Sequence, residues 1–175
     1  MNTVCVYRTG KSKVISQNIK SNLENKSKEL NMPYAYVDGS YNIATKRFGY
    51  GVVFFTDNIT ETGEPEFFTL SKSFSEPELA EMRNVAGEIM GAAQAIKSAR
   101  ARGYKSITIY HDYEGIAKWC TGEWKAKKVW TKKYKAFYDE ISKDISVSFK
   151  KVEAHSGNKY NDLADQLAKE AVGNK

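Results

Sequence analysis

Three runs of β-branched and aromatic residues lie close together in the first half of the chain, and their spacing limits what the chain can fold into. They span residues 34–41, 48–56 and 67–74, and turn-forming residues separate them. Parallel strands need a crossover connection of about a dozen residues or more. The shorter connections here therefore predict three antiparallel neighbours.

A helical pattern follows these strands. Apolar residues recur at helical spacing between residues 85 and 96, and Gly103 is typical of the residue that closes a helix. Two starts remain open for this helix. One is a capping box from Ser75 to Glu78, and the other is an N-cap at Asn84.

The second half of the chain alternates between the two kinds of element. Residues 106–110 and 147–154 have the composition of strands, residues 114–120 and 131–141 that of helices, and a last helix is expected over residues 161–171. The predicted order is βββαβααβα. Antiparallel strands followed by alternating helices and strands favour an α/β fold, with a mixed sheet that carries helices on its faces.

Length and composition narrow the class of protein further. The 175 residues suggest one domain, and a formal net charge of +6 favours a polyanionic partner. Residues 1–32 have too few apolar positions to fold alone, so we expect a short N-terminal extension, not an independent domain, before a domain at residues 33–175. Cys5 and Cys120 fit reduced thiols. The sequence has no signal peptide and no stretch apolar enough to span a membrane, so we expect a cytoplasmic monomer without a membrane partner.

Four acidic residues fall on or beside apolar faces of four different elements, and they could converge at the centre of the sheet. They are Asp38 in the first strand, Glu88 in the first helix, Asp112 at the end of the fourth strand and Asp165 in the last helix. Clustered carboxylates repel each other and are costly to bury, so a cation is expected among them. Ligation by oxygen alone favours Mg²⁺, with Mn²⁺ as a possible substitute. Such a site suits phosphodiester cleavage by two metal ions.

Each of these acids also has an ordinary structural role open to it. Asp38 could be a turn residue, Glu88 a rim residue of an amphipathic helix, and Asp112 the N-cap of the next helix. Asp165 could be a solvated acid, and Asp162 is a rival for its role. Singly each signal is weak, whereas the set in this order is a strong one.

The motifs around these acids resemble those of type 1 ribonucleases H. The likeness covers residues 34–172 and includes Val37-Asp38-Gly39-Ser40, Asn84 with Glu88 four residues later, Ile107 to Tyr110 ending at Asp112, and His155-Ser156-Gly157 followed by Asn161, Ala164 and Asp165. The resemblance implies a ribonuclease H-like fold with a five-stranded mixed sheet in a catalytic domain at residues 33–175. It maps the four metal-binding acids onto Asp38, Glu88, Asp112 and Asp165, and the spacing from His155 selects Asp165 over Asp162.

His155 lies in a flexible loop before the last helix, where the resemblance implies proton transfer and product release. The implied activity is that of a metal-dependent endonuclease. Such an enzyme would hydrolyse the RNA strand of RNA–DNA hybrids with two Mg²⁺ ions per site and leave 5′-phosphate and 3′-hydroxyl ends.

All three tryptophans fall in one lysine-rich segment, residues 118–135, which has a single acid before residue 135. Lysines contact phosphates and aromatic rings can stack on sugars or bases, although a solvated helix pair is the alternative. We expect Trp119 in the core or at its edge and the other two nearer the substrate. The candidate substrate-binding residues are Gly39, Ser40, Asn84, Trp124, Lys125, Lys127, Lys128, Trp130 and Asn161.

Two other functions compete with this interpretation. A non-catalytic nucleic-acid-binding module would keep the fold without the acids, so the intact set argues against it. A DNA nuclease or strand-transfer enzyme of the same general fold would also use acids. It would not be expected to retain the block from His155 to Asp165.

Overall fold

The computed structural model describes residues 32–153 and 157–174. The chain divides into two units, Met1–Met32 and Pro33–Lys175, and the fold below is that of the second. The expected extension at residues 1–32 lies outside the described residues except for Met32.

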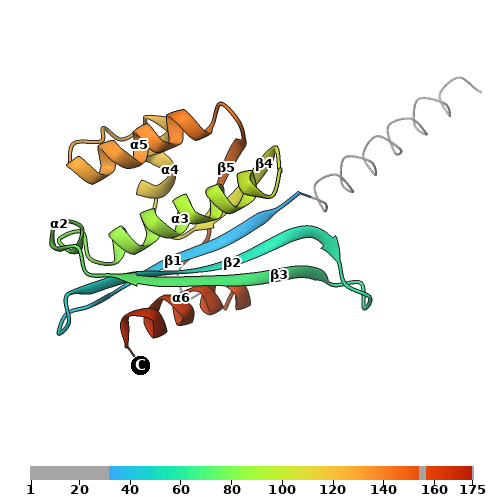
Figure 1. The fold of residues 1–175 in the computed structure, drawn as a ribbon, viewed down its shortest axis with the longest axis horizontal. Coiled ribbons are helices and arrows are strands. Elements are labelled where there is room, and N and C mark those ends of the chain that lie inside the picture. Colours follow the sequence, from blue (N-terminus) through green and yellow to red (C-terminus); the bar gives the residue numbers. More distant parts are fainter. Residues whose placement is uncertain (1–31, 154–156, 175) are drawn as a thin grey trace, which may run out of the picture. The chain divides into compact units, whose positions relative to one another are not determined.

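Five strands form one mixed sheet in the order β3-β2-β1-β4-β5 (Figure 1). β1 (Tyr34–Asn42), β2 (Arg47–Ile59) and β3 (Pro65–Phe74) are antiparallel neighbours. β4 (Ser106–His111) runs parallel to β1, and β5 (Ser146–Lys151) runs parallel to β4. The five-stranded mixed sheet expected from the sequence is confirmed.

Helices lie on both faces of this sheet. One face carries α3 (Asn84–Ala101), beside which α4 (Gly115–Thr121) and α5 (Val129–Ile141) pack, and the other carries α6 (Lys159–Val172) (Figure 1). The larger part of the core lies on the α3 side. None of the helices in the described residues is long and apolar enough to cross a membrane.

The start of the long helix differs from both sequence predictions. Pro77–Ala80 form a separate short helix, α2, whose N-cap is Glu76. Asn84 is the first residue of α3 and not its N-cap, a position that Arg83 takes with φ 53° and ψ −130°. Because these angles are far from helical ones, the chain turns at Arg83 and a single helix from Ser75 cannot form.

Two glycines let the helices approach the sheet closely. A Cβ atom on Gly39 would lie 2.2 Å from the Asn84 carbonyl oxygen of α3, and one on Gly51 would lie 2.0 Å from the Ala164 carbonyl oxygen of α6. Any side chain at these positions would push the helices away. The glycines therefore set the depth at which Glu88 of α3 and Asp165 of α6 lie against β1.

Candidate active site

Three carboxylates from three elements meet at the end of the parallel strands. Asp38 is in β1, Glu88 is in α3, and Asp112 directly follows β4. One carboxylate oxygen of each lies within 4.8 Å of the others, and we call these three residues the carboxylate cluster. Asp38 is 9% exposed and Glu88 is 2% exposed. Asp38 and Glu88 are thus largely desolvated on a strand and a helix, and the half-buried Asp112 lies at a strand end.

Burial and repulsion by neighbouring carboxylates both disfavour ionisation of Asp38 and Glu88. Burial, reinforced by Asp112, raises the pKa of Asp38 to about 7, although the Gly39 N–H donates to Asp38 Oδ1 at 2.6 Å. Burial, reinforced by Asp112 and Asp38, raises the pKa of Glu88 to about 9. A nearby cation would reverse both effects, because an opposite charge favours the ionised form.

The donor set fits a hard divalent cation. Its ligands would be carboxylate oxygens, which Mg²⁺ and Mn²⁺ prefer over softer donors. Glu88 Oε2 is buried and has no hydrogen-bond partner. Because buried polar atoms are nearly always satisfied, this oxygen points to a ligand that the protein itself does not supply.

Asp165 lies close enough to influence the cluster, but it is not one of the three acids within 4.8 Å. Its charge contributes to the raised pKa of Asp38. Lys169, one helical turn further along α6, forms an ion pair with Asp165, and its Nζ lies 2.6 Å from Asp165 Oδ2. Lys169 is not among the residues predicted from the sequence, although its spacing of four residues from Asp165 on a predicted helix indicates such a pair.

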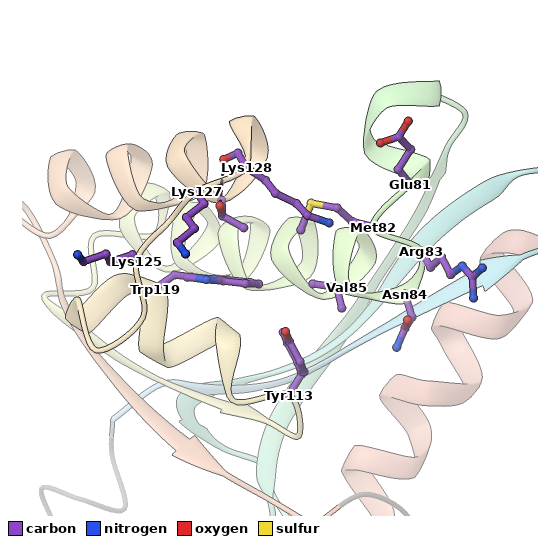
Figure 2. A pocket seen from close by; sticks show the side chains of 11 residues that line it. Glu81, Met82, Arg83, Asn84, Val85, Tyr113, Trp119, Lys125, Lys127 and Lys128 are labelled. Atoms are coloured by element: carbon purple, nitrogen blue, oxygen red, sulfur yellow. Dashed lines mark hydrogen bonds between the residues drawn. The ribbon is translucent and has the colours of Figure 1, made fainter.

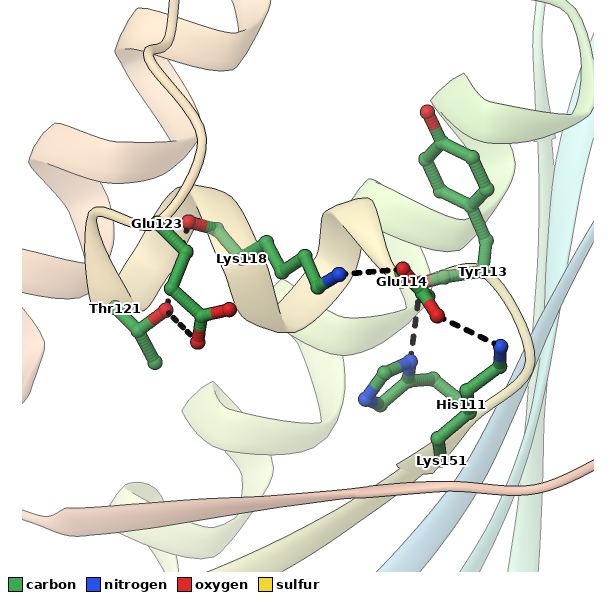
Figure 3. Close-up of polar contacts among 7 residues, drawn as sticks. All are labelled: His111, Tyr113, Glu114, Lys118, Thr121, Glu123 and Lys151. Carbon is green, nitrogen blue, oxygen red and sulfur yellow. Dashed lines mark hydrogen bonds and ion pairs between the residues drawn. The ribbon is translucent and has the colours of Figure 1, made fainter.

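A polar network holds the loop that carries Asp112 (Figure 3). The Glu114 carboxylate forms ion pairs with Lys118 at 2.6 Å and with Lys151 of β5 at 2.9 Å. His111 Nδ1 lies 3.0 Å from the Tyr113 carbonyl oxygen. The loop is therefore tied to both α4 and β5, which fixes Asp112 between them.

Beside the carboxylate cluster lies a basic hollow of about 350 Å³ (Figure 2). Lys125, Lys127 and Lys128 line it from the connection between α4 and α5, and we call these three residues the lysine surface. Asn84 lines the hollow from the start of α3. These four residues are among the substrate contacts predicted from the sequence. Arg83, which is not among them, also lines the hollow and has the unusual backbone angles.

Other members of the basic segment are engaged elsewhere. Lys118 pairs with Glu114, and Lys135 pairs with Asp139, so neither is a free cation. Trp119 is 9% exposed and belongs to the core, as the sequence predicted. Trp124 is 37% exposed and packs edge-on against Trp119.

Trp130 packs against a small cluster around Phe48 and Leu79, and its Nε1 is buried without a partner. Lys133 lies over its ring at 3.9 Å. Trp130 also lines a second hollow next to Lys127 and Lys128. Its place is partly structural, and contact with substrate stays a prediction.

The remaining candidate residues have mixed positions. Ser40 is buried, and its hydroxyl accepts a 3.1 Å hydrogen bond from Asn174. Asn161 is 3% exposed with an unpartnered Oδ1, so substrate contact by its side chain stays a prediction. His155 lies outside the described residues, and so does Cys5. Cys120 is a buried free thiol.

A protein family and several solved structures match this chain. The RNase H family model matches residues 30–173, which is most of the chain. The structure is similar to RNase H1 from the halophilic archaeon Halobacterium salinarum, with a TM-score of 0.64, 20% identity, and coverage of 81% of this chain and 98% of that one.

Two further solved structures have the same fold. The N-terminal RNase H domain of a Mycobacterium tuberculosis protein gives a TM-score of 0.64 at 17% identity and covers 81% of this chain and 94% of that one. LC11-RNase H1, in complex with an RNA/DNA hybrid, gives 0.60 at 18% identity, with 80% and 99% covered. A comparison with curated protein sequences found no match.

The fold and the acidic site thus define a metal-dependent hydrolase of the nuclease class. The chain belongs to the RNase H family, and the protein is a ribonuclease H.

Proposed function

We propose that this ribonuclease H hydrolyses the RNA strand of RNA–DNA hybrids and leaves 5′-phosphate and 3′-hydroxyl ends. The observation that carries the proposal is the carboxylate cluster, in which Asp38 and Glu88 are buried, Asp112 is half-buried and one Glu88 oxygen has no hydrogen-bond partner. A similar solved protein, LC11-RNase H1, is described in complex with an RNA/DNA hybrid, which supports the substrate class.

Asp38, Glu88 and Asp112 would hold the divalent cation, and Asp165 would complete the set from α6. Mg²⁺ is the expected ion, Mn²⁺ a substitute, and two ions per site are expected with substrate bound. When bound, the metal supplies positive charge that polarises the phosphodiester and lowers the pKa of water. Lys169 keeps the Asp165 carboxylate oriented through their 2.6 Å ion pair.

Residues around the carboxylate cluster would bind and position the hybrid. The lysine surface and Asn84 line the same basic hollow, so lysines would contact phosphates while Asn84 reaches the minor groove. Selection of RNA requires contacts with 2′-hydroxyls. Backbone groups near Gly39 and Ser40, together with Glu88, are the groups we assign to those contacts. Proton transfer and product release by His155 rest on its place in the sequence.

Cleavage of end-labelled substrates tests the proposal. RNA–DNA hybrid, duplex DNA and duplex RNA are each incubated with Mg²⁺, with Mn²⁺ and with EDTA. We expect cutting of only the RNA strand of the hybrid, only with metal, and with ends that a 5′-phosphate-dependent exonuclease can digest. Hybrid binding without cutting would replace the proposal with a binding module, and cutting of duplex DNA would replace it with a DNA nuclease.

A further inference from the structure

One acidic side chain, Glu81, lines three hollows, and the first of these is the basic hollow beside the carboxylate cluster. Their volumes are about 350, 430 and 500 Å³. In the first of these, Glu81 is the sole acidic residue of a lining that includes all three residues of the lysine surface. An exposed carboxylate at the rim of a basic hollow opposes the binding of a polyanion.

Packing of α2 holds Glu81 at this place. Leu79 and Ala80 are buried, at 4% and 7% exposure, in a cluster with Phe48 and Ala86. Glu81 follows directly as the C-cap of α2 and is exposed. The anchored turn therefore presents the carboxylate to solvent at the rim of the hollows (Figure 2).

Glu81 does not neutralise the lysines that line the same hollows. In the part of the chain that the structure describes, no ion pair joins Glu81 to Lys125, Lys127 or Lys128. Glu78 of α2 also lines the third hollow opposite Lys127 and Lys128, again without an ion pair. The acids of α2 and the lysine surface thus form two separate walls of opposite charge.

We propose that Glu81 limits the affinity of the lysine surface for a nucleic-acid backbone and so speeds the release of the cut hybrid. The proposal rests on the proposed function for its substrate class. Phosphates that approach the lysines also approach Glu81, and like charges repel over distances of about a Debye length, roughly 10 Å at 0.1 M salt. Because a cut strand keeps most of its phosphates, its departure depends on how tightly the backbone is held. Product release sets the turnover rate of many enzymes.

The test compares Glu81→Gln with Glu61→Gln in an Asp38→Asn background with Mg²⁺, where the hybrid is expected to stay intact. Glu61 is an exposed acid in the turn between β2 and β3, at the other end of the sheet from α2 (Figure 1). Both variants change the net charge equally. Fluorescence anisotropy gives the affinity for hybrid, and chase with unlabelled hybrid gives the dissociation rate.

We expect Glu81→Gln to bind hybrid about two- to five-fold tighter at low salt, chiefly through slower dissociation, as for one charge removed in a water-like dielectric. The gain should shrink between about 50 and 200 mM salt. Glu61→Gln should change neither quantity. In the otherwise wild-type protein, Glu81→Gln should lower the multiple-turnover rate and leave single-turnover cleavage unchanged.

Unchanged affinity for Glu81→Gln would overturn the inference, since the acid would then lie outside the reach of the backbone. Weaker binding would overturn it in the opposite sense, because Glu81 would then accept hydrogen bonds from the hybrid. The binding readout needs no cleavage. Failure of the proposed function, seen as no metal-dependent cutting, is therefore distinguishable from failure of this inference.

Discussion

Asp38 and Glu88 lie almost fully buried on a strand and a helix that meet through Gly39, whereas the lysine surface lies on an exposed connection between two helices. Burial raises the pKa of both acids far above the usual range. Desolvated charges interact strongly and depend on exact placement, while exposed charges are screened and contribute in small, roughly additive steps. A single change should therefore be severe in the carboxylate cluster and mild on the lysine surface.

The largest expected effect is the loss of cleavage in Asp38→Asn or Asp112→Asn. Either change removes a proposed metal ligand. Replacing a residue that only hydrogen-bonds to a metal ligand lowers activity about ten- to a hundred-fold, so loss of the ligand itself should lower the cleavage rate by more than about a hundred-fold. Hybrid binding, measured by fluorescence anisotropy, should persist because the lysine surface is intact. Undiminished cutting would remove the metal-site assignment.

Asp162→Asn is the matched control for Asp165→Asn, since both acids lie on α6 and Asp162 is exposed. Cleavage by Asp165→Asn should fall sharply while cleavage by Asp162→Asn stays near wild type. The reverse result would move the fourth acid from Asp165 to its rival.

The next effect concerns stability and its dependence on pH. The folded protein without metal holds protons on Asp38 up to a pKa of about 7 and on Glu88 up to about 9, whereas the unfolded chain releases them at lower pH. Their contribution to stability is therefore fully present at acidic pH and is lost as pH rises through these values. Urea unfolding in EDTA should show stability falling between about pH 5 and pH 9.

Saturating Mg²⁺ should remove most of that fall, since ligand binding stabilises the folded state. Glu88→Gln should flatten the pH dependence in EDTA, because the amide does not titrate. If stability falls equally steeply with pH in Glu88→Gln, Glu88 is not the group responsible. Burial of that carboxylate would then not set the pH dependence of stability.

The sequence predicted the sheet well because its patterns are local. Strand composition and short connections between residues 34 and 74 depend on neighbours in the chain, and so does the alternation that follows. The structure extends β2 to Ile59 and starts β3 at Pro65, a difference at the ends of elements where the signal is weakest.

Local sequence patterns do not predict the break between α2 and α3. Pro77 and three glutamates look like the start of one helix, but burial of Leu79 and Ala80 and the turn at Arg83 end α2 after one turn. These are tertiary contacts with distant residues, and they override local propensity. The same contacts hold Glu81 at the rim of the basic hollow, which no spacing in the sequence indicates.

The lysine surface should respond more gently than the carboxylate cluster. Replacing Lys125, Lys127 and Lys128 together by alanine should weaken hybrid binding and lower the slope of log K against log salt by about 0.9 for each phosphate that is no longer neutralised. Single replacements should each produce a fraction of the effect. Anisotropy titrations at several salt concentrations measure both quantities.

A triple replacement elsewhere on the surface controls for net charge. The chosen lysines are Lys105, Lys143 and Lys150. If this control lowers the salt slope as much, the binding is spread over the whole surface and the lysine surface is not a distinct site.

The smallest expected effect lies at Arg83, which lines the basic hollow together with the lysine surface and has backbone angles of φ 53° and ψ −130°. Glycine adopts positive φ without a Cβ clash, so Arg83→Gly should stabilise the protein, by about 1 kcal/mol in urea unfolding. Arg83→Ala keeps the strain and should not stabilise the protein.

Arg102→Gly is the matched control, because Arg102 has an ordinary φ of −84° and its guanidinium lies over Phe68. That variant should be destabilised. A loss of stability in Arg83→Gly would mean that the arginine side chain contributes more to the fold than its backbone costs.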